Sequence, residues 1–171
     1  MPVFTLQPFP GTSCPAVKSI TVAAKRSGTN LDLAYILEGD IAALKVPAPS
    51  AAVPAEKLWE HTCFELFFTE LGEDLYHEYN FSPSTAWNHY QFSDYREPAE
   101  GAKVRPAIRT TKTATSLRVD VSVQLATDEE VDAALAAVIE TNDGKLTYWA
   151  LAHTNPDEPD FHDPQAFVAT L

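Results

Sequence analysis

The chain has 171 residues, with 12 basic and 24 acidic side chains and a formal net charge of −12 at pH 7. Proteins that bind nucleic acids or anionic membranes usually present positive charge, so this composition argues against both partners. No apolar run reaches the roughly 18 residues of a membrane-spanning helix, and the first residues lack the basic and apolar regions of a secretory signal. The two cysteines, Cys14 and Cys63, are too few for a disulfide framework. We therefore expect one soluble, cytoplasmic domain over residues 1–171, with reduced thiols.

Alternating apolar and polar residues recur along the chain and predict a series of short β-strands. In the run from Leu117 to Leu125 every second residue is apolar, which is the clearest strand pattern in the sequence. Similar patterns predict strands at residues 19–25, 31–38, 138–141 and 146–153. Only Asp128 to Ala137 has helical character, with an acidic N-cap and an acidic first turn. Many short strands with one short helix are typical of an all-β fold, an antiparallel β-sandwich or jelly roll.

Residues 58–95 hold most of the aromatic side chains of the chain. Three further strand-like runs follow one another in this segment, at 61–68, 75–82 and 87–92. If simple hairpin loops connect the runs, Phe68 pairs with Leu75 and Ser82 pairs with Trp87. Because side chains alternate between the faces of a sheet, this register predicts an apolar face in the core and a polar face opposite it. The polar face is predicted to carry His61, Glu65, Glu78, Asn80, His89 and Gln91, bordered by Trp59, Phe67, Tyr76 and Trp87.

In this register Glu65 lies directly opposite Glu78 on the polar face. Like charges at such positions destabilise a sheet, so one pKa is expected to be raised unless a cation, a protonated histidine or a ligand hydroxyl relieves the repulsion. Aromatic rings beside convergent hydrogen-bonding groups are typical of sites for a sugar or another small ring. The alternative is an ordinary solvated sheet face, and an error of one residue in the register would exchange the two faces.

The C-terminal part of the chain offers further polar candidates. His153 ends a predicted strand, and the turn-rich segment that follows contains Asp160-Phe161-His162. These residues could supply pocket groups or metal ligands, but a tight turn anchored by Phe161 is the favoured interpretation. No recognised metal-binding spacing of histidines or cysteines is present, so we assign no metal ligand.

Sequence signatures of catalysis are missing. The chain has no nucleophile elbow and no glycine-rich phosphate loop. Cys63 near His61 is interpreted as a packed cysteine rather than a nucleophile. The Glu65 and Glu78 pair leaves glycoside hydrolysis as a minor alternative, because directly opposed residues place their carboxylates too close for it.

Several motifs of the chain resemble one bacterial protein group. The segment 58–68, LWEHTCFELFF, is followed by 79–84, YNFSPS, and later by 148–153, YWALAH, and 159–162, PDFH. This series is similar to DOMON-like bacterial proteins, in the superfamily of DOMON domains and family-nine carbohydrate-binding modules, and it extends over nearly the whole chain. The resemblance implies a single DOMON-like β-sandwich, immunoglobulin-like or of jelly-roll type, that binds a small ligand.

The resemblance also implies two classes of ligand, sugar and haem. Sugar-binding relatives hold their ligand with tryptophans and polar groups, a role that Trp59, Trp87 or Trp149 would play here. Haem-binding relatives use a methionine and a histidine, but Met1 is the only methionine, so this ligation is disfavoured. A pair of histidines would have to replace it, drawn from His61, His77, His89, His153 and His162.

Calcium is a further cofactor that the resemblance allows, because family-nine modules can carry structural calcium. The acid-rich stretches 70–74 and 157–163 are the candidate loops, although neither has a defined calcium-loop pattern. No cofactor is firmly implied.

From these observations we expect a non-catalytic domain that binds a small polar molecule, a saccharide or a sugar-like metabolite. Its predicted ligand-binding residues are Trp59, His61, Glu65, Glu78, Asn80, Trp87, His89, Trp149 and His153. The alternatives are a protein-interaction module, a haem- or metal-binding domain, and an enzyme that uses the Glu65 and Glu78 pair.

Overall fold

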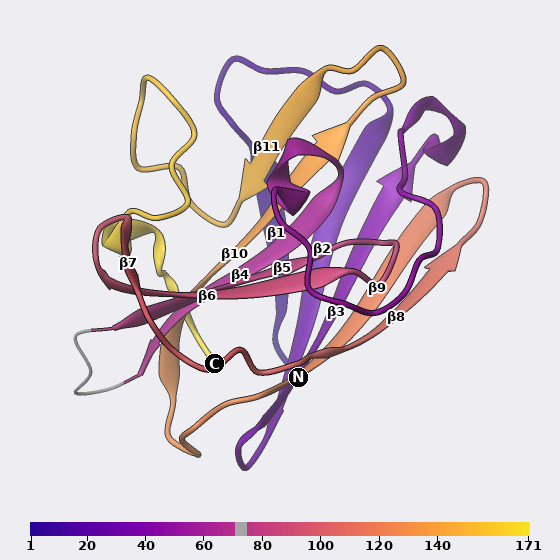
Figure 1. The fold of residues 1–171 in the computed structure, drawn as a ribbon. Helices are drawn as coiled ribbons and strands as arrows, with labels where there is room; N and C mark the ends of the chain where they lie inside the picture. Colours follow the sequence, from indigo (N-terminus) through magenta and orange to yellow (C-terminus); the bar gives the residue numbers. More distant parts are fainter. Residues whose placement is uncertain (71–74) are drawn as a thin grey trace.

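The chain forms two antiparallel β-sheets in a computed structural model that describes residues 1–70 and 75–171 (Figure 1). The first sheet contains, in spatial order, β1 (Val3–Pro8), β2 (Val17–Ser27), β3 (Asn30–Gly39), β9 (Ser116–Gln124) and β8 (Ala107–Lys112). The second sheet contains, in spatial order, β7 (Glu97–Ala99), β6 (Trp87–Asp94), β5 (Tyr76–Phe81), β4 (Cys63–Glu70), β10 (Val131–Glu140) and β11 (Leu146–Ala150). A short strand, β12 (Ala169–Thr170), also pairs with β10.

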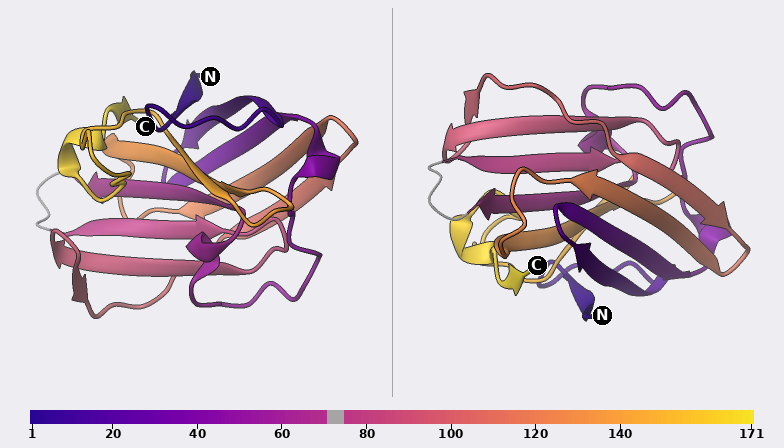
Figure 2. Two further views of the ribbon diagram at one scale, coloured as in Figure 1. Left: turned by 90° about the horizontal axis from the view of Figure 1, so that it is seen from above. Right: turned by 90° about the horizontal axis from the view of Figure 1, so that it is seen from below.

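The first strand connects the two sheets. Residues 3–6 of β1 pair with β2, whereas Gln7 and Pro8 pair with β11. The chain can therefore bend from one layer into the other without a break in backbone hydrogen bonding. Figure 2 shows the sheet of β5 and β6 nearest to the viewer from above, and the sheet of β8 and β9 nearest from below. This arrangement confirms the predicted antiparallel β-sandwich.

The core lies between the two layers. Side chains that alternate inward from both sheets, such as Leu33 and Leu37 on β3 and Phe64 and Leu66 on β4, belong to one continuous hydrophobic cluster. Tyr35 is also fully buried in this cluster, and its hydroxyl donates a hydrogen bond to the backbone carbonyl of Glu65 at 2.8 Å. This bond satisfies a buried hydroxyl and ties the first sheet to β4.

The other expected strands are confirmed, but the expected helix at 128–137 is wrong. Most of this segment belongs to β10, which lies between β4 and β11 and pairs with both. Its alanines favour a helix in isolation, but here Leu135, Ala137 and Ile139 pack into the core, while Ala136 and Val138 are buried on the other face. A strand buried on both faces lacks the apolar–polar alternation by which a half-exposed strand is recognised.

The helical elements among the described residues are short 3₁₀ turns, η1 (Ile41–Ala43), η2 (Leu58–Glu60) and η3 (Pro164–Ala166). None of these described helices is long and apolar enough to cross a membrane. The turn η2 matters most for function, because it places a tryptophan above the second sheet.

The pairing of β4 with β5 differs from the predicted register by two residues. Glu65 pairs with Asn80 rather than with Glu78. A shift of two residues leaves every side chain on its predicted face. Glu65 and Glu78 therefore share the outer face of the second sheet, as diagonal neighbours rather than as a directly opposed pair. The expected hairpin loop between these strands includes residues 71–74, which lie outside the described residues.

The pairing of β5 with β6 differs from the predicted register by one residue, which has a larger consequence. Asn80 pairs with Asn88 instead of His89. The reason is the loop at 82–86, which is one residue longer than predicted and contains Thr85 with a φ of 77°. A backbone in the left-handed region at Thr85 closes this longer loop.

A one-residue shift exchanges the two faces of a strand. The predicted outer-face positions of three residues on β6 are therefore wrong, because the inner face carries Trp87, His89 and Gln91. The outer face carries Asn88, Tyr90 and Phe92 instead. The aromatic side chains of β6 on the same face as Glu78 are therefore Tyr90 and Phe92, and not Trp87 as predicted.

Candidate functional site

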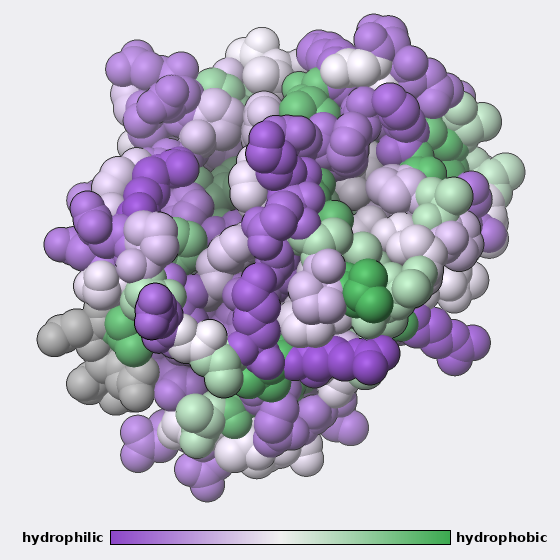
Figure 3. Space-filling view, viewed as in Figure 1, coloured by the Kyte–Doolittle hydropathy of each residue, from purple (hydrophilic) through white to green (hydrophobic). Residues whose placement is uncertain are grey.

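A cavity of about 440 Å³ lies on the outer face of the second sheet, the face turned away from the first sheet. Strands β4, β5, β6, β10 and β11 contribute to it, together with η2, the β6–β7 hairpin and the C-terminal segment 159–162. The cavity is lined by Trp59, Glu65, Phe67, Glu78, Tyr90, Phe92, Arg96, Pro98, Val138, Tyr148, Pro159, Phe161 and His162. Figure 3, viewed as Figure 1 with the β6 edge of the second sheet in front, shows mostly hydrophilic side chains with hydrophobic residues in small patches between them.

Two carboxyl groups line the cavity although their side chains are almost completely buried. Glu65 on β4 is 2% exposed and Glu78 on β5 is 6% exposed. On the adjacent strand β10, Ala136 is directly opposite Glu65 and Ala134 is opposite Phe67. These small alanine side chains cover little of the sheet, so the surface beside the carboxyl groups stays hollow.

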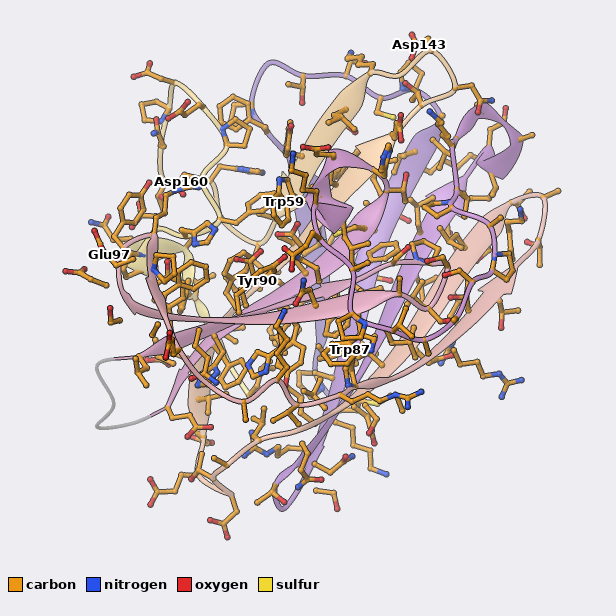
Figure 4. All side chains as sticks on the ribbon, in the orientation of Figure 1. Trp59, Trp87, Tyr90, Glu97, Asp143 and Asp160 are labelled. Carbon is orange, nitrogen blue, oxygen red and sulfur yellow. The ribbon has the colours of Figure 1, made fainter. Side chains whose placement is uncertain are left out.

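Aromatic rings form the walls of the cavity. Trp59 on η2 meets Tyr90 on β6 edge-on, with ring centroids 6.0 Å apart. Phe67 on β4 packs against Phe161 of the C-terminal segment at 6.4 Å. Figure 4 shows Trp59 and Tyr90 close together on one side of the β6 ribbon. Rings on several sides keep solvent away from the carboxyl groups and present flat apolar surfaces to any bound molecule.

His162 links Glu78 to the cavity wall. Its Nε2 lies 3.3 Å from Oε2 of Glu78, and its Nδ1 lies 2.8 Å from the hydroxyl oxygen of Tyr76. That oxygen also accepts a hydrogen bond from the backbone N–H of Arg96 at 3.0 Å, so the Tyr76 proton is directed at Nδ1. The Nε2–H of His162 then faces Glu78. Burial and the nearby Arg96 charge lower the pKa of His162 to about 4, so the ring is neutral at pH 7.

An ion pair joins the β6–β7 hairpin to the C-terminal segment at one side of the cavity. Arg96 lies in the hairpin turn with a φ of 53°, and its Nη2 is 3.0 Å from Oδ1 of Asp160. The Tyr95 hydroxyl donates to the other carboxylate oxygen of Asp160 at 2.6 Å. Burial alone would raise the pKa of Asp160, but these hydrogen bonds from Tyr95 and Arg96 lower it. The charge of Arg96 is therefore balanced locally by Asp160.

The two cavity carboxyl groups hold protons far more strongly than exposed glutamates do. Burial raises the pKa of Glu78 from 4.5 to about 7, although the nearby Asn80 amide and the Arg96 charge offset part of this effect. Burial also raises the pKa of Glu65 well above its ordinary value, and the charge of Glu78 raises it further. Buried titratable groups with displaced pKa values in a cavity are typical of functional sites.

Some of the residues predicted to bind a ligand lie at this cavity. Trp59, Glu65 and Glu78 line it. Asn80 is on the same face of the sheet, opposite Glu65, and is 0% exposed. Its amide nitrogen and oxygen make no well-formed hydrogen bond with any described residue.

Two predicted residues lie elsewhere and have other partners. His61 binds the carboxylate of Glu140 at 2.8 Å, and Lys45 binds the same carboxylate at 3.1 Å. His153 contacts the backbone carbonyl of Gln7 through its Nε2 at 2.8 Å. The structure does not bring these two histidines to the cavity.

Three predicted residues belong to the inner side of the second sheet. Trp149 is part of the core, and its indole N–H donates to the hydroxyl of Thr147 at 3.0 Å. His89 stacks on Tyr79 with ring centroids 4.1 Å apart. Trp87 is 4% exposed, and Figure 4 shows it on the opposite side of the β6 ribbon from Tyr90. These side chains support the sheet from below the cavity.

Several cavity residues were not among the predicted ligand-binding residues. Tyr90 and Phe92 face the cavity because the β5–β6 loop is one residue longer than predicted. The length of this loop was the only signal in the sequence that could have shown which face of β6 is the outer one. Phe161 and His162 come from the segment that the sequence favours as a simple tight turn. Arg96 lies in a short turn, and no pattern in the sequence connects it with Glu78.

The described residues contain no group of three or more histidine, cysteine, aspartate or glutamate side chains arranged to hold a metal ion. In the candidate calcium stretch 157–163, Asp160 binds Arg96, and Asp163 caps η3 by accepting from the backbone N–H of Gln165. The other candidate stretch includes residues 71–74, which lie outside the described part.

Among the histidines considered for haem, two lie in direct contact. Nδ1 of His77 and Nε2 of His89 are 3.0 Å apart. The remaining ring nitrogen of His89 accepts a hydrogen bond from the backbone N–H of Val104 at 3.0 Å. Both nitrogens of His89 are therefore engaged within the protein, which does not suit an axial haem ligand.

The fold is shared with solved carbohydrate-binding proteins. No protein-family model and no curated protein matches the chain. A candidate carbohydrate-binding protein from Bacteroides uniformis aligns with a TM-score of 0.66 and 11% sequence identity, over 95% of this chain and 84% of that chain. A family-nine carbohydrate-binding module from Caldicellulosiruptor kristjanssonii, in complex with cellotriose, aligns with a TM-score of 0.57 and 10% identity, over 97% and 76% of the two chains. A family-nine module from the same organism in complex with glucose gives a TM-score of 0.53 and 10% identity, over 91% and 73%.

At these identities the comparisons show the fold alone. They support the part of the predicted resemblance that concerns carbohydrate-binding modules of family nine. Membership of the DOMON-like group stays a prediction.

Proposed function

We propose that this protein binds a saccharide in the cavity over Glu65 and Glu78, and that it acts as a binding domain without turnover. The observation that carries this proposal is the combination of aromatic walls with two buried carboxyl groups in one cavity. The volume of about 440 Å³ falls within the range of roughly 300–1,000 Å³ that is usual for small-molecule sites. The shared fold of carbohydrate-binding modules supports the same ligand class.

The lining residues suit the two kinds of surface on a sugar ring. The rings of Trp59 and Tyr90 offer flat apolar surfaces for its C–H faces. A protonated carboxyl at Glu65 both donates and accepts hydrogen bonds, as a sugar hydroxyl does, and Glu78 can accept in either protonation state. Such groups fix the orientation of a ligand whose rings provide the contact area.

The first test uses the tryptophan at the rim of the cavity. Trp59 is 39% exposed, whereas Trp87 and Trp149 are 4% and 6% exposed, so a fluorescence change on adding sugar reports mainly on Trp59. We expect Trp59→Ala to weaken saccharide binding about tenfold, the value of one stacked ring. Trp59→Phe keeps most of the affinity but loses the fluorescence change. Titration calorimetry and fluorescence with mono- and disaccharides measure both effects.

The matched control is Val53→Ser, because Val53 is 51% exposed and does not line the cavity. This variant should bind as the unchanged protein does. If Trp59→Ala binds sugars with undiminished affinity, the cavity is not the site. Release of a shortened or rearranged sugar during prolonged incubation would contradict the absence of turnover.

A further inference from the structure

We infer that the saccharide carries a protonated amine, and that this ammonium group binds over Glu65 and Glu78. This inference rests on the proposed function and specifies its ligand class. Aminosugars would be preferred to neutral sugars of the same shape. The reasons are the unpaired carboxyl groups of the cavity, a buried amide oxygen that has no hydrogen-bond partner among the described residues, and the aromatic walls.

The first reason is that no lysine or arginine of the described residues forms an ion pair with either carboxyl group. Among the described residues, Glu65 forms no ion pair, and its side chain is contacted by the thiol of Cys63 at 3.5 Å. The one described residue within ion-pair distance of Glu78 is His162, through its imidazole. The Nδ1 of this imidazole accepts the hydrogen bond from Tyr76 and therefore carries no proton, so the ring supplies an N–H donor at Nε2 but no positive charge.

The second reason is that the one arginine in the cavity lining is already paired. The guanidinium of Arg96 binds the carboxylate of Asp160 and the hydroxyl of Tyr95. Its charge acts on Glu78 only from a distance. With Glu65 protonated and Glu78 ionised, the charges of Glu78, Asp160 and Arg96 sum to −1, which one bound ammonium would neutralise.

The third reason is the amide of Asn80. It is fully buried on the same face as the two carboxyl groups. Its nitrogen acts on Glu78, whose pKa it lowers, whereas its oxygen forms no hydrogen bond with a described residue. Buried amides of this kind are costly unless a partner satisfies them. An ammonium group has three N–H donors. Glu65, Glu78 and the Asn80 carbonyl offer a matching set of acceptors on one face of the sheet.

The aromatic walls fit the same ligand. Aromatic faces attract a cation in addition to the apolar face of a sugar, and this attraction is strongest where solvent is excluded. Trp59, Phe67 and Phe161 line the cavity together with the two carboxyl groups. A neutral sugar would use the rings but would leave the negative charge of an ionised Glu78 unbalanced.

The test compares sugars that differ at one substituent. Titration calorimetry at pH 7 measures glucosamine and 6-amino-6-deoxyglucose against glucose and N-acetylglucosamine. We expect at least one aminosugar to bind about tenfold more tightly than glucose, the gain of one charge-assisted hydrogen bond. N-acetylation removes the charge and should abolish this gain. Glu78→Gln should weaken aminosugar binding about tenfold and glucose binding by much less.

The control is Glu38→Gln, because Glu38 is an exposed residue of the first sheet and lies outside the cavity. It should leave both affinities unchanged. Glucose binding as tightly as both aminosugars would overturn this inference and leave the proposed function intact. Binding of no sugar at all would overturn the proposed function itself. Cyclohexylamine binding as tightly as the aminosugars would show that the site recognises a cation without a saccharide, and would overturn both.

Discussion

Glu78→Gln is expected to raise the free energy of unfolding by about 3 kcal/mol at pH 8 and to leave it almost unchanged at pH 4. The pKa of Glu78 is raised from 4.5 to about 7, first of all by burial, and a tenfold change in proton affinity corresponds to about 1.4 kcal/mol. Below pH 4.5 the carboxyl is protonated in both the folded and the unfolded chain. Between pH 4.5 and 7 only the unfolded chain loses its proton, so stability falls as the pH rises. A glutamine has no charge to bury and avoids this loss.

Urea denaturation at several pH values between 4 and 8 measures the effect. The groups around Glu78 whose titration must be considered are Glu65 and Cys63 on β4, Tyr76 on β5, Tyr90 on β6, Arg96 in the β6–β7 turn and His162 in the C-terminal segment. Glu38→Gln, at an exposed position, should follow the pH dependence of the unchanged protein. A Glu78→Gln variant that is less stable at every pH would show that the charge of Glu78 is stabilising rather than costly.

This prediction has a functional consequence. Two buried carboxyl groups at the wall of a cavity reduce stability at neutral pH, and groups that cost stability in this way cluster at binding and catalytic sites. A ligand that donates hydrogen bonds to them or supplies a positive charge would recover this free energy on binding.

Phe67→Ala is expected to lower the free energy of unfolding by about 4 kcal/mol, the usual cost of removing a buried phenylalanine ring. Phe67 is 1% exposed, and its ring packs against Phe161, His162 and Phe167 of the C-terminal segment. Its loss should therefore release this segment from the second sheet. Saccharide binding should weaken as well, because Phe67 and the segment both line the cavity.

Phe64→Ala is the matched control for this prediction. Phe64 is the same residue type on the same strand, but it faces the core and is 0% exposed. Both variants should lose stability in urea denaturation. Only Phe67→Ala should speed hydrogen exchange in residues 159–167 relative to the rest of the chain. Equal acceleration of this segment in both variants would contradict the proposed contact.

The alternation of apolar and polar residues was sufficient to predict most strands. It also predicted that Glu65 and Glu78 lie on the same face of one sheet. Strand alternation identifies half-exposed strands such as β9, and a register error of two residues does not move a side chain to the other face. The same reasoning failed for β6. One additional loop residue places Tyr90 on the outer face, where His89 was predicted. This reasoning also failed for β10, whose alanines favour a helix but are buried on both sides of a sheet.

The amino-acid sequence by itself therefore determined the all-β sandwich, its acidic character and the two glutamates of the site. Each of these depends on composition or on side-chain periodicity, which are local properties of the chain. Only the tertiary structure decided which residues surround the glutamates. His162 contacts Glu78 and Arg96 acts on it from a distance. These two residues come from segments far apart in the chain, which the ion pair with Asp160 and the Tyr76 hydroxyl connect. The packing of two separate segments over one sheet depends on contacts between distant residues, and no local pattern encodes it.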